Sequence, residues 1–335
     1  MRIRYEDMKR EFERILIKKG VEEARAKEAA EIFADSSADG VYSHGYLRFP
    51  RVVEYIEKGY IDVHALPETE VSVGAAQRWN GHLGLGMLNA KLAMARAVEL
   101  ARQFGIGMVA MHHTNHWMRG GTYGWQAADA GCIGICWTNT GPIMPAWGAR
   151  DSRIGNNPFI LAVPRKNGEH VVVDTAMALY SYGKLETTRL NGEQLPYAGG
   201  FDAAGNLTCD PAAIEETMRV LPIGYWKGSG MSIAFDLIAN MMTLGNTVTK
   251  IREECEDEYG LSQVFIAIDP ALLSGDCDAA DELIAQVLAD IHASVPDEAG
   301  RAARYPGEST LKRRKENMEK GIPVKEEIWN RICAM

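Results

Sequence analysis

The sequence has 335 residues, of which 46% are hydrophobic and 24% charged, so it can bury a large core and does not resemble a disordered chain. Its formal net charge of −9 provides no basic field for a phosphate backbone, and we expect no nucleic-acid partner. No stretch has the apolar length of a secretory signal or a membrane span, and the six cysteines form no C-x-x-C pair. These features predict a cytoplasmic globular protein with reduced thiols and no membrane contact.

Apolar spacing in the first half predicts helices over 8–20, 22–34 and 49–59, with a polar loop over 39–48 between the second and the third. An alanine-rich helix over 88–104 ends at Gly105, and a buried strand over 106–111 leads into a second polar loop, 112–121. A helix over 123–130 and a strand over 132–138 follow. This alternation of helices and strands predicts an α/β fold.

In the second half, strands over 159–163 and 171–174 are predicted on either side of a turn at Lys166–Gly168. An exposed loop is expected over 199–208, helices over 229–244 and 279–293, and a buried strand over 264–268. The basic run Lys312–Lys315 is interpreted as a solvated helix face in a C-terminal segment that packs back on the body. We expect a helical portion of residues 1–75 with 245–335 and an α/β portion of residues 76–244.

The first polar loop contains Ser43, His44 and Arg48. Histidine exchanges protons near neutral pH, which suits the reduction of a carbonyl group, because the developing alkoxide needs a proton. An arginine four residues later lies on the same side if the loop runs into a helix, and its guanidinium pairs with a carboxylate. This spacing is compatible with catalysis on a 2-oxo acid and equally with a surface histidine beside a capping serine.

The second polar loop contains His112, His113 and His116, with Asn115 and Arg119. Histidines three or four residues apart can bind zinc, and a metal-dependent hydrolase is therefore one alternative. No glutamate or cysteine accompanies them, so we predict no metal and interpret the loop as a polar wall of a substrate pocket.

A Rossmann fingerprint is missing. Gly84 and Gly86 begin like G-x-G-x-x-G, but Asn89 occupies the place of the last glycine, and Gly228 and Gly230 are likewise followed by Ile233. The segment Trp226–Gly230 opens a helix and is either an anion site or an ordinary helix start. A dinucleotide, if bound, needs another scaffold.

Six segments in chain order resemble the motifs of the malate/L-lactate dehydrogenase family, which lacks a Rossmann fold. Four longer stretches are more similar to a member that reduces a sugar-derived 2-oxo acid. The six segments are Tyr42–Gly45 with Arg48, Asn115–His116 with Gly120 and Gly121, Ile154–Pro158, Val173–Ala176, Gly192–Pro196 and Tyr225–Gly230. The four stretches are Gly40–Gly45, Asn115–Gly121, Gly134–Asn139 and Ile223–Ser232.

The resemblance implies a mixed sheet with helices and a helical N-terminal portion, assembled as a homodimer. It implies that His44 is the proton donor and that NADH, or alternatively NADPH, is the cofactor. Substrate-binding residues implied by position are Ser43, Arg48, Asn115 and His116. Cofactor-binding residues implied by position are His170, Val171, Val172, Val173, Asp174, Thr175, Ala176, Trp226, Lys227, Gly307, Glu308 and Ser309.

The predicted function is the nicotinamide-dependent reduction of a 2-oxo carboxylate, with hydride transfer to the carbon whose oxygen receives the proton of His44. Within the family the substrate could instead be malate, sulfolactate, ureidoglycolate or a cyclic imino acid. Outside it, the alternatives are the metal-dependent hydrolase and a cofactor-binding regulator without turnover.

Overall fold

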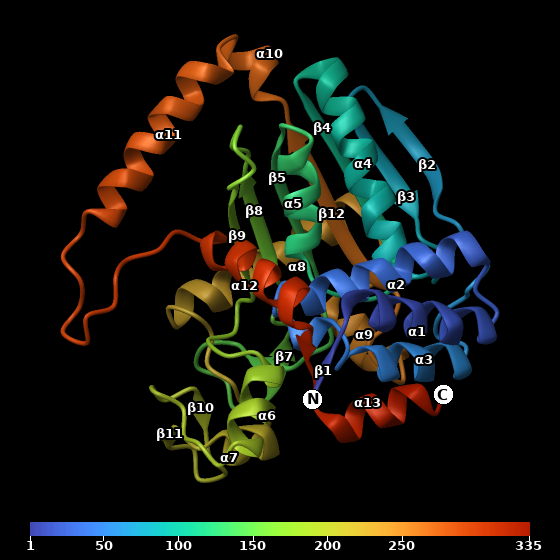
Figure 1. The fold of residues 1–335 in the computed structure, drawn as a ribbon. Helices are drawn as coiled ribbons and strands as arrows, with labels where there is room; N and C mark the ends of the chain where they lie inside the picture. The colour runs from blue at the N-terminus through green and yellow to red at the C-terminus, as the bar shows by residue number, and fades with distance from the viewer.

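The computed structural model describes residues 1–335, and its centre is a seven-stranded mixed sheet in the order β2-β3-β4-β12-β5-β8-β9 (Figure 1). Only β3 and β4 are parallel, and every other neighbouring pair is antiparallel. The strands are β2 (Glu68–Val73), β3 (Ala76–Asn80), β4 (Ile106–Thr114), β5 (Ile133–Thr138), β8 (Phe159–Val163), β9 (Val171–Thr175) and β12 (Leu261–Ile268).

Helices cover both faces of this sheet. Helices α4 (Gly86–Phe104) and α5 (Gly121–Asp129) pack on one face, and the apolar helix α8 (Trp226–Thr243) packs on the other (Figure 1). Helix α4 ends where Gly105 adopts a left-handed conformation with φ of 84°, as its sequence predicts. The two faces give two apolar layers and confirm the predicted α/β class.

A separate helical cluster lies below one end of the sheet (Figure 1). Its core of 26 buried residues includes Phe12, Phe33 and Phe49, and the rings of Phe12 and Phe49 stack with centroids 4.3 Å apart. Strands β1 (Arg2–Ile3) and β13 (Ile322–Pro323) pair, so both chain ends meet here. The helices are α1 (Tyr5–Lys18), α2 (Glu23–Ala38), α3 (Phe49–Glu57) and α13 (Glu326–Cys333).

A smaller unit is built around α6 (Tyr182–Leu190) and α7 (Pro211–Thr217) and has its own small core. The predicted loop over 199–208 contains a short hairpin, since β10 (Gly200–Phe201) pairs with β11 (Leu207–Thr208). The remaining elements are the 3-10 turn η1 (Tyr42–His44), β6 (Met144–Pro145), β7 (Ser152–Ile154), α9 (Val248–Glu254), α10 (Pro270–Ser274), α11 (Cys277–His292) and α12 (Glu308–Lys320).

Three expectations need correction. The division at residue 244 does not separate sheet from helices, because β12 lies in the middle of the sheet between β4 and β5. Strand β4 continues through Thr114, so His112 and His113 are strand residues and not loop residues. The basic run on α12 is not wholly solvated, because Arg314 forms ion pairs with Asp35 and Asp39 of the α2 segment.

Helix α11 projects away from the body and returns through a long connection to α12 (Figure 1). Its side chains Leu283 and Val287 are 63% and 58% exposed. No helix combines the length and the apolar character that crossing a bilayer requires.

Candidate active site

The loop that carries His44 is fixed by the end of α2. The hydroxyl of Ser37 accepts a hydrogen bond from the backbone N–H of Tyr46 at 2.9 Å. Gly45 lies so close to this serine that a Cβ at residue 45 would be 2.2 Å from its Oγ. A glycine is therefore required at this position, and the turn Tyr42–His44 has one fixed location against α2.

His44 and His116 come together from two loops that are far apart in the sequence. Their rings stack with centroids 5.6 Å apart and planes at 17°. The backbone N–H of Met118 donates to Nδ1 of His116 at 3.0 Å, so a neutral His116 carries its proton on Nε2. The hydroxyl of Ser43 lies 3.1 Å from Nδ1 of His44. The structure thus brings together three of the predicted site residues.

Both imidazoles are held neutral by their surroundings. Burial, followed by the positive charges of Arg48 and Arg119, lowers the pKa of His44 to about 4. Burial and the charge of Arg48 lower the pKa of His116 well below its ordinary value. Ionisable groups with strongly shifted pKa values cluster at functional sites, so this pair marks a candidate active site.

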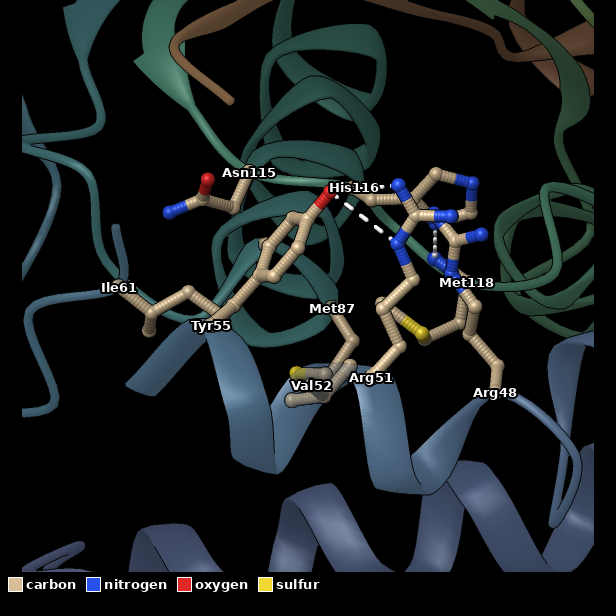
Figure 2. A pocket seen from close by; sticks show the side chains of 10 residues that line it. Arg48, Arg51, Val52, Tyr55, Ile61, Met87, Asn115, His116 and Met118 are labelled. Atoms are coloured by element: carbon tan, nitrogen blue, oxygen red, sulfur yellow. Dashed lines mark hydrogen bonds between the residues drawn. The ribbon is translucent and has the colours of Figure 1, made fainter. Parts of the chain in front are cut away.

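Arg48 and Arg51 extend from the start of α3 toward His116 (Figure 2). Nη2 of Arg48 is 3.2 Å from a carboxylate oxygen of Glu258, and the other oxygen of this carboxylate accepts from the N–H of Gly141 at 3.0 Å. Arg51 donates to the hydroxyl of Tyr55 and pairs with Asp257 at 2.7 Å. No local sequence signal identifies Glu258, which lies 210 residues after Arg48.

The two histidines, the two arginines and Glu258 line a cleft of about 890 Å³. This volume is within the range of ligand sites in proteins. The walls come from the His44 loop, α3, the start of α5, β9, α6 and the start of α12. Lining residues include Ser43, His44, Arg48, Arg51, His116, Arg119, Thr140, Asn156, Asp174, Ser181, Tyr182, Glu186, Glu258, Gly307 and Thr310.

Asn115 has a different place from the one expected. Its side-chain amide donates to the backbone carbonyls of Tyr60, Leu83 and Gly84 at 3.1, 2.7 and 3.1 Å, and it does not line the large cleft. Three bonds to backbone indicate that Asn115 holds neighbouring loops, which fixes the backbone next to His116. Its assignment as a substrate ligand stays a prediction.

Of the twelve residues expected to bind the cofactor, some line the cleft and the others do not. Val172, Val173, Asp174, Ala176 and Gly307 line it. Glu308 instead contacts His292 at 3.1 Å, and Trp226 is 65% exposed at the start of α8. The other predicted residues outside the lining are His170, Val171, Thr175, Lys227 and Ser309.

Asp174 and the buried Arg119 form a charged pair where β9 and the start of α5 line the cleft. The carboxylate of Asp174 accepts from the N–H of Gly121 at 2.9 Å and lies 3.8 Å from Nε of Arg119. Burial raises the pKa of Asp174 despite the neighbouring guanidinium. Arg119 also pairs with Asp39, so this wall is held to the α2 segment.

The three histidines of the second polar segment do not converge. His112 contacts His113 at 2.6 Å and Glu70 at 3.0 Å, whereas His116 faces His44. No group of three or more histidine, cysteine or acidic side chains is arranged to hold a metal ion. The geometry therefore gives no support to the hydrolase alternative that rests on these histidines.

A family model described as malate/L-lactate dehydrogenase matches residues 3–333. The chain belongs to this family. The 2,3-diketo-L-gulonate reductase of Pasteurella multocida (strain Pm70) is 47% identical over the full length of both chains. The protein of the same name from Escherichia coli O1:K1 / APEC is 45% identical, again over both full lengths. These relatives confirm the likeness to a reductase of a sugar-derived acid within the malate/L-lactate dehydrogenase family.

Solved structures of the malate/L-lactate dehydrogenase family have the same fold. Sulfolactate dehydrogenase from Methanocaldococcus jannaschii superposes with a TM-score of 0.90 at 28% identity, covering 99% of this chain and 95% of its own. Malate dehydrogenase from Entamoeba histolytica gives a TM-score of 0.94 at 22% identity, with 99% and 96% covered, which shows the fold alone. The predicted mixed-sheet fold without a Rossmann domain and the predicted oxidoreductase class are confirmed, and the class implies a nicotinamide cofactor.

Proposed function

We propose that this protein reduces 2,3-diketo-L-gulonate to 3-dehydro-L-gulonate with NADH, in the cleft that contains His44. The observation that carries the proposal is the convergence of His44, His116 and Arg48 on one cleft. The choice of substrate is supported by the full-length relatives of that name.

The cleft has features that suit a dinucleotide. Gly307 has a left-handed φ of 95°, and a Cβ there would lie 3.1 Å from the carbonyl of His170 and the N–H of Val172. No side chain caps α12, which begins after Gly307 at the cleft, and of its first three N–H groups only that of Ser309 has no backbone partner, so this N–H can face a phosphate. Residues 170–176, Gly307 and Ser309 would hold the cofactor. Trp226 and Lys227, at the start of α8, complete the proposed set. NADH supplies the hydride when bound.

Arg48 has the geometry to bind the substrate carboxylate. Only Nη2 of its guanidinium is hydrogen-bonded, to Glu258, so other N–H groups remain for a bidentate contact. A carboxylate bound at Arg48 offsets the positive charge that lowers the pKa of His44. His44 can then hold a proton and donate it to the oxygen of the 2-oxo group. Nε2–H of His116 is the second donor for that oxygen, and Ser43 orients His44.

The proposal includes a homodimer in the cytoplasm. Exposed apolar side chains run along α8 and the α10–α11 segment, and surfaces of this kind are typical of an interface between protein subunits. They are Met231, Leu237, Ile238, Met241, Leu272, Leu273, Leu283 and Val287.

An assay of NADH oxidation tests the proposal. The purified protein is given 2,3-diketo-L-gulonate, oxaloacetate, 3-sulfopyruvate or Δ1-piperideine-2-carboxylate, each with NADH and with NADPH. We expect the highest kcat/KM with 2,3-diketo-L-gulonate and NADH. Binding of NADH without oxidation by any of these substrates would contradict the proposal and favour a regulator.

A further inference from the structure

We propose that helix α6 is the wall of the cleft that selects the substrate's distal chain, accepting neutral hydroxyl groups and rejecting a second anionic group. This inference rests on the proposed function, because it needs a 2-oxo acid whose carboxylate lies at Arg48. It assigns roles to Glu186 and Tyr182, which the sequence motifs did not single out.

Helix α6 lies directly against the His44 loop. A Cβ at Gly183 would be 2.8 Å from the Cβ of Ser43, so the helix backbone is in contact with the residue next to His44. The hydroxyl of Tyr182 donates to the carbonyl of Ile143 at 2.9 Å, which ties the first turn of α6 to another wall of the cleft. A chain that extends from a 2-oxo group at His44 therefore has α6 within reach.

One face of α6 lines the cleft. Tyr182, Glu186 and Arg189 are four and three residues apart, the spacing that places side chains on the same side of a helix. Ser181, which caps the helix, and Glu215 of α7 also line the cleft. Each of these side chains can form hydrogen bonds, and hydroxyl groups of a substrate can pair with them.

The charges on this wall differ from those on the opposite wall. On the α3 and α5 side, three cations, Arg48, Arg51 and Arg119, line the cleft with two carboxylates, Asp174 and Glu258. On the α6 side, the guanidinium of Arg189 is engaged by Glu215 in an ion pair. Glu186 has neither a hydrogen-bond nor an ion-pair partner. On the α6 side, two lining carboxylates, Glu186 and Glu215, therefore face one lining cation, Arg189, so carboxylates are in excess on this wall and cations on the opposite one.

This charge pattern separates two kinds of 2-oxo acid. A hydroxylated chain donates hydrogen bonds to the carboxylate of Glu186 and to the oxygen of Tyr182. A second carboxylate or a sulfonate would instead lose water beside Glu186, on a wall where carboxylates outnumber cations, which disfavours it by like-charge repulsion. The wall selects by repulsion as well as by attraction.

The test compares kcat/KM for 2,3-diketo-L-gulonate and for oxaloacetate with NADH in the full-length protein. Wild type should favour the sugar acid, and Glu186→Lys should lower this preference by about tenfold or more by adding a cation for the second carboxylate. Glu186→Gln, which keeps the shape, should lower the preference by about threefold. The matched control is Glu216→Lys, the same charge change at an exposed residue of α7 outside the cleft lining.

The outcomes are distinct. An unchanged preference in both Glu186 variants, or an equal shift in Glu186→Lys and Glu216→Lys, would overturn the role of the wall while leaving the proposed function intact. Absence of NADH oxidation by wild type with either acid would overturn the proposed function, and the inference with it. Binding of NADH by each variant, measured by fluorescence, checks that the variants are folded.

Discussion

His44 determines the chemistry of the site through its protonation state. The ligand-free cleft holds it neutral, because burial and two arginines lower its pKa to about 4. A neutral imidazole accepts a proton in the direction of alcohol oxidation, whereas carbonyl reduction needs the imidazolium. In the proposed mechanism, an anion bound at Arg48 offsets part of the positive charge that, after burial, lowers the pKa of His44, and this favours the imidazolium.

We predict that the ¹³Cε1 resonance of His44 does not titrate between pH 5.5 and 8 in the free protein. Adding the small acid oxamate should raise its pKa, because the carboxylate offsets the charge of Arg48. NMR of protein labelled at histidine measures this, and a His44→Gln spectrum assigns the signal. Titration near 6.5 without ligand would show that the loop is more open than the structure indicates.

The same two histidines make folding sensitive to acid. Their folded-state pKa values lie below the ordinary value of about 6.5, so between that pH and the folded pKa the unfolded chain binds more protons. Stability is therefore lost as pH falls through this range. His44 should lower the free energy of unfolding by about 1–2 kcal/mol between pH 7 and pH 5, and His116 should act in the same direction.

Urea unfolding at both pH values measures this loss. The double variant His44→Gln with His116→Gln should have a flatter dependence on pH than wild type, because glutamine does not titrate. Equal pH dependence in the two proteins would show that other groups, and not this pair, control acid stability.

The residues of the candidate site were predictable only in part. The four-residue spacing of His44 and Arg48 is local, and both residues line the cleft as expected. The partner of Arg48 was not predictable, because Glu258 reaches it through the tertiary fold. The bonds from the side-chain amide of Asn115 to three backbone carbonyls were not predictable either, because those carbonyls lie in segments more than 30 residues away, and its role as a substrate ligand stays a prediction.

At the scale of elements, α12 connects the expected cofactor side of the cleft to the helical cluster. Its N-terminus meets the cleft at Gly307, and Arg314 in its middle pairs with Asp35 and Asp39 at 2.6 and 2.9 Å. The side-chain amide of Asn317 donates to the carbonyl of Ala38 at 2.8 Å. These contacts fix the start of the helix relative to β9.

We predict that Arg314→Met weakens NADH binding about fivefold and lowers the free energy of unfolding by about 2 kcal/mol, because it leaves Asp39 with one cation fewer. Titration of NADH fluorescence and urea unfolding measure the two effects. Lys315→Met is the matched control, since this neighbouring lysine is exposed and forms no ion pair. The same effects in both variants would contradict a specific role for Arg314.

Helices and strands were largely predictable from apolar spacing, and their order in the sheet was not. Periodicity identified the buried strand within β12, but only tertiary pairing places it between β4 and β5, which precede it by more than a hundred residues. The extension of β4 to Thr114 was missed because His112 and His113 are polar. They lie in a strand because Leu261 of β12 pairs with Thr114.

At the scale of the whole molecule, the exposed apolar side chains of α8 and α11 lead us to expect a homodimer. Sedimentation velocity should give about twice the mass of 36.9 kDa. Leu283→Glu on α11 should shift the protein to monomers, because a carboxylate would be buried in an apolar interface. Leu66→Glu is the control, since Leu66 is similarly exposed, at 61% against 63%, and lies outside both helices. A wild-type monomer would contradict the dimer.

The central claim is that the assembled cleft reduces a 2-oxo acid with His44 as proton donor, and its most direct test is a rapid-mixing measurement of one turnover. Enzyme preloaded with NADH is mixed with excess 2,3-diketo-L-gulonate, and the loss of absorbance is followed in wild type and in His44→Gln. We predict loss of NADH in wild type and a rate lower by about a thousandfold in the variant, with NADH binding unchanged. A variant that binds NADH and retains most of the wild-type rate would contradict the account.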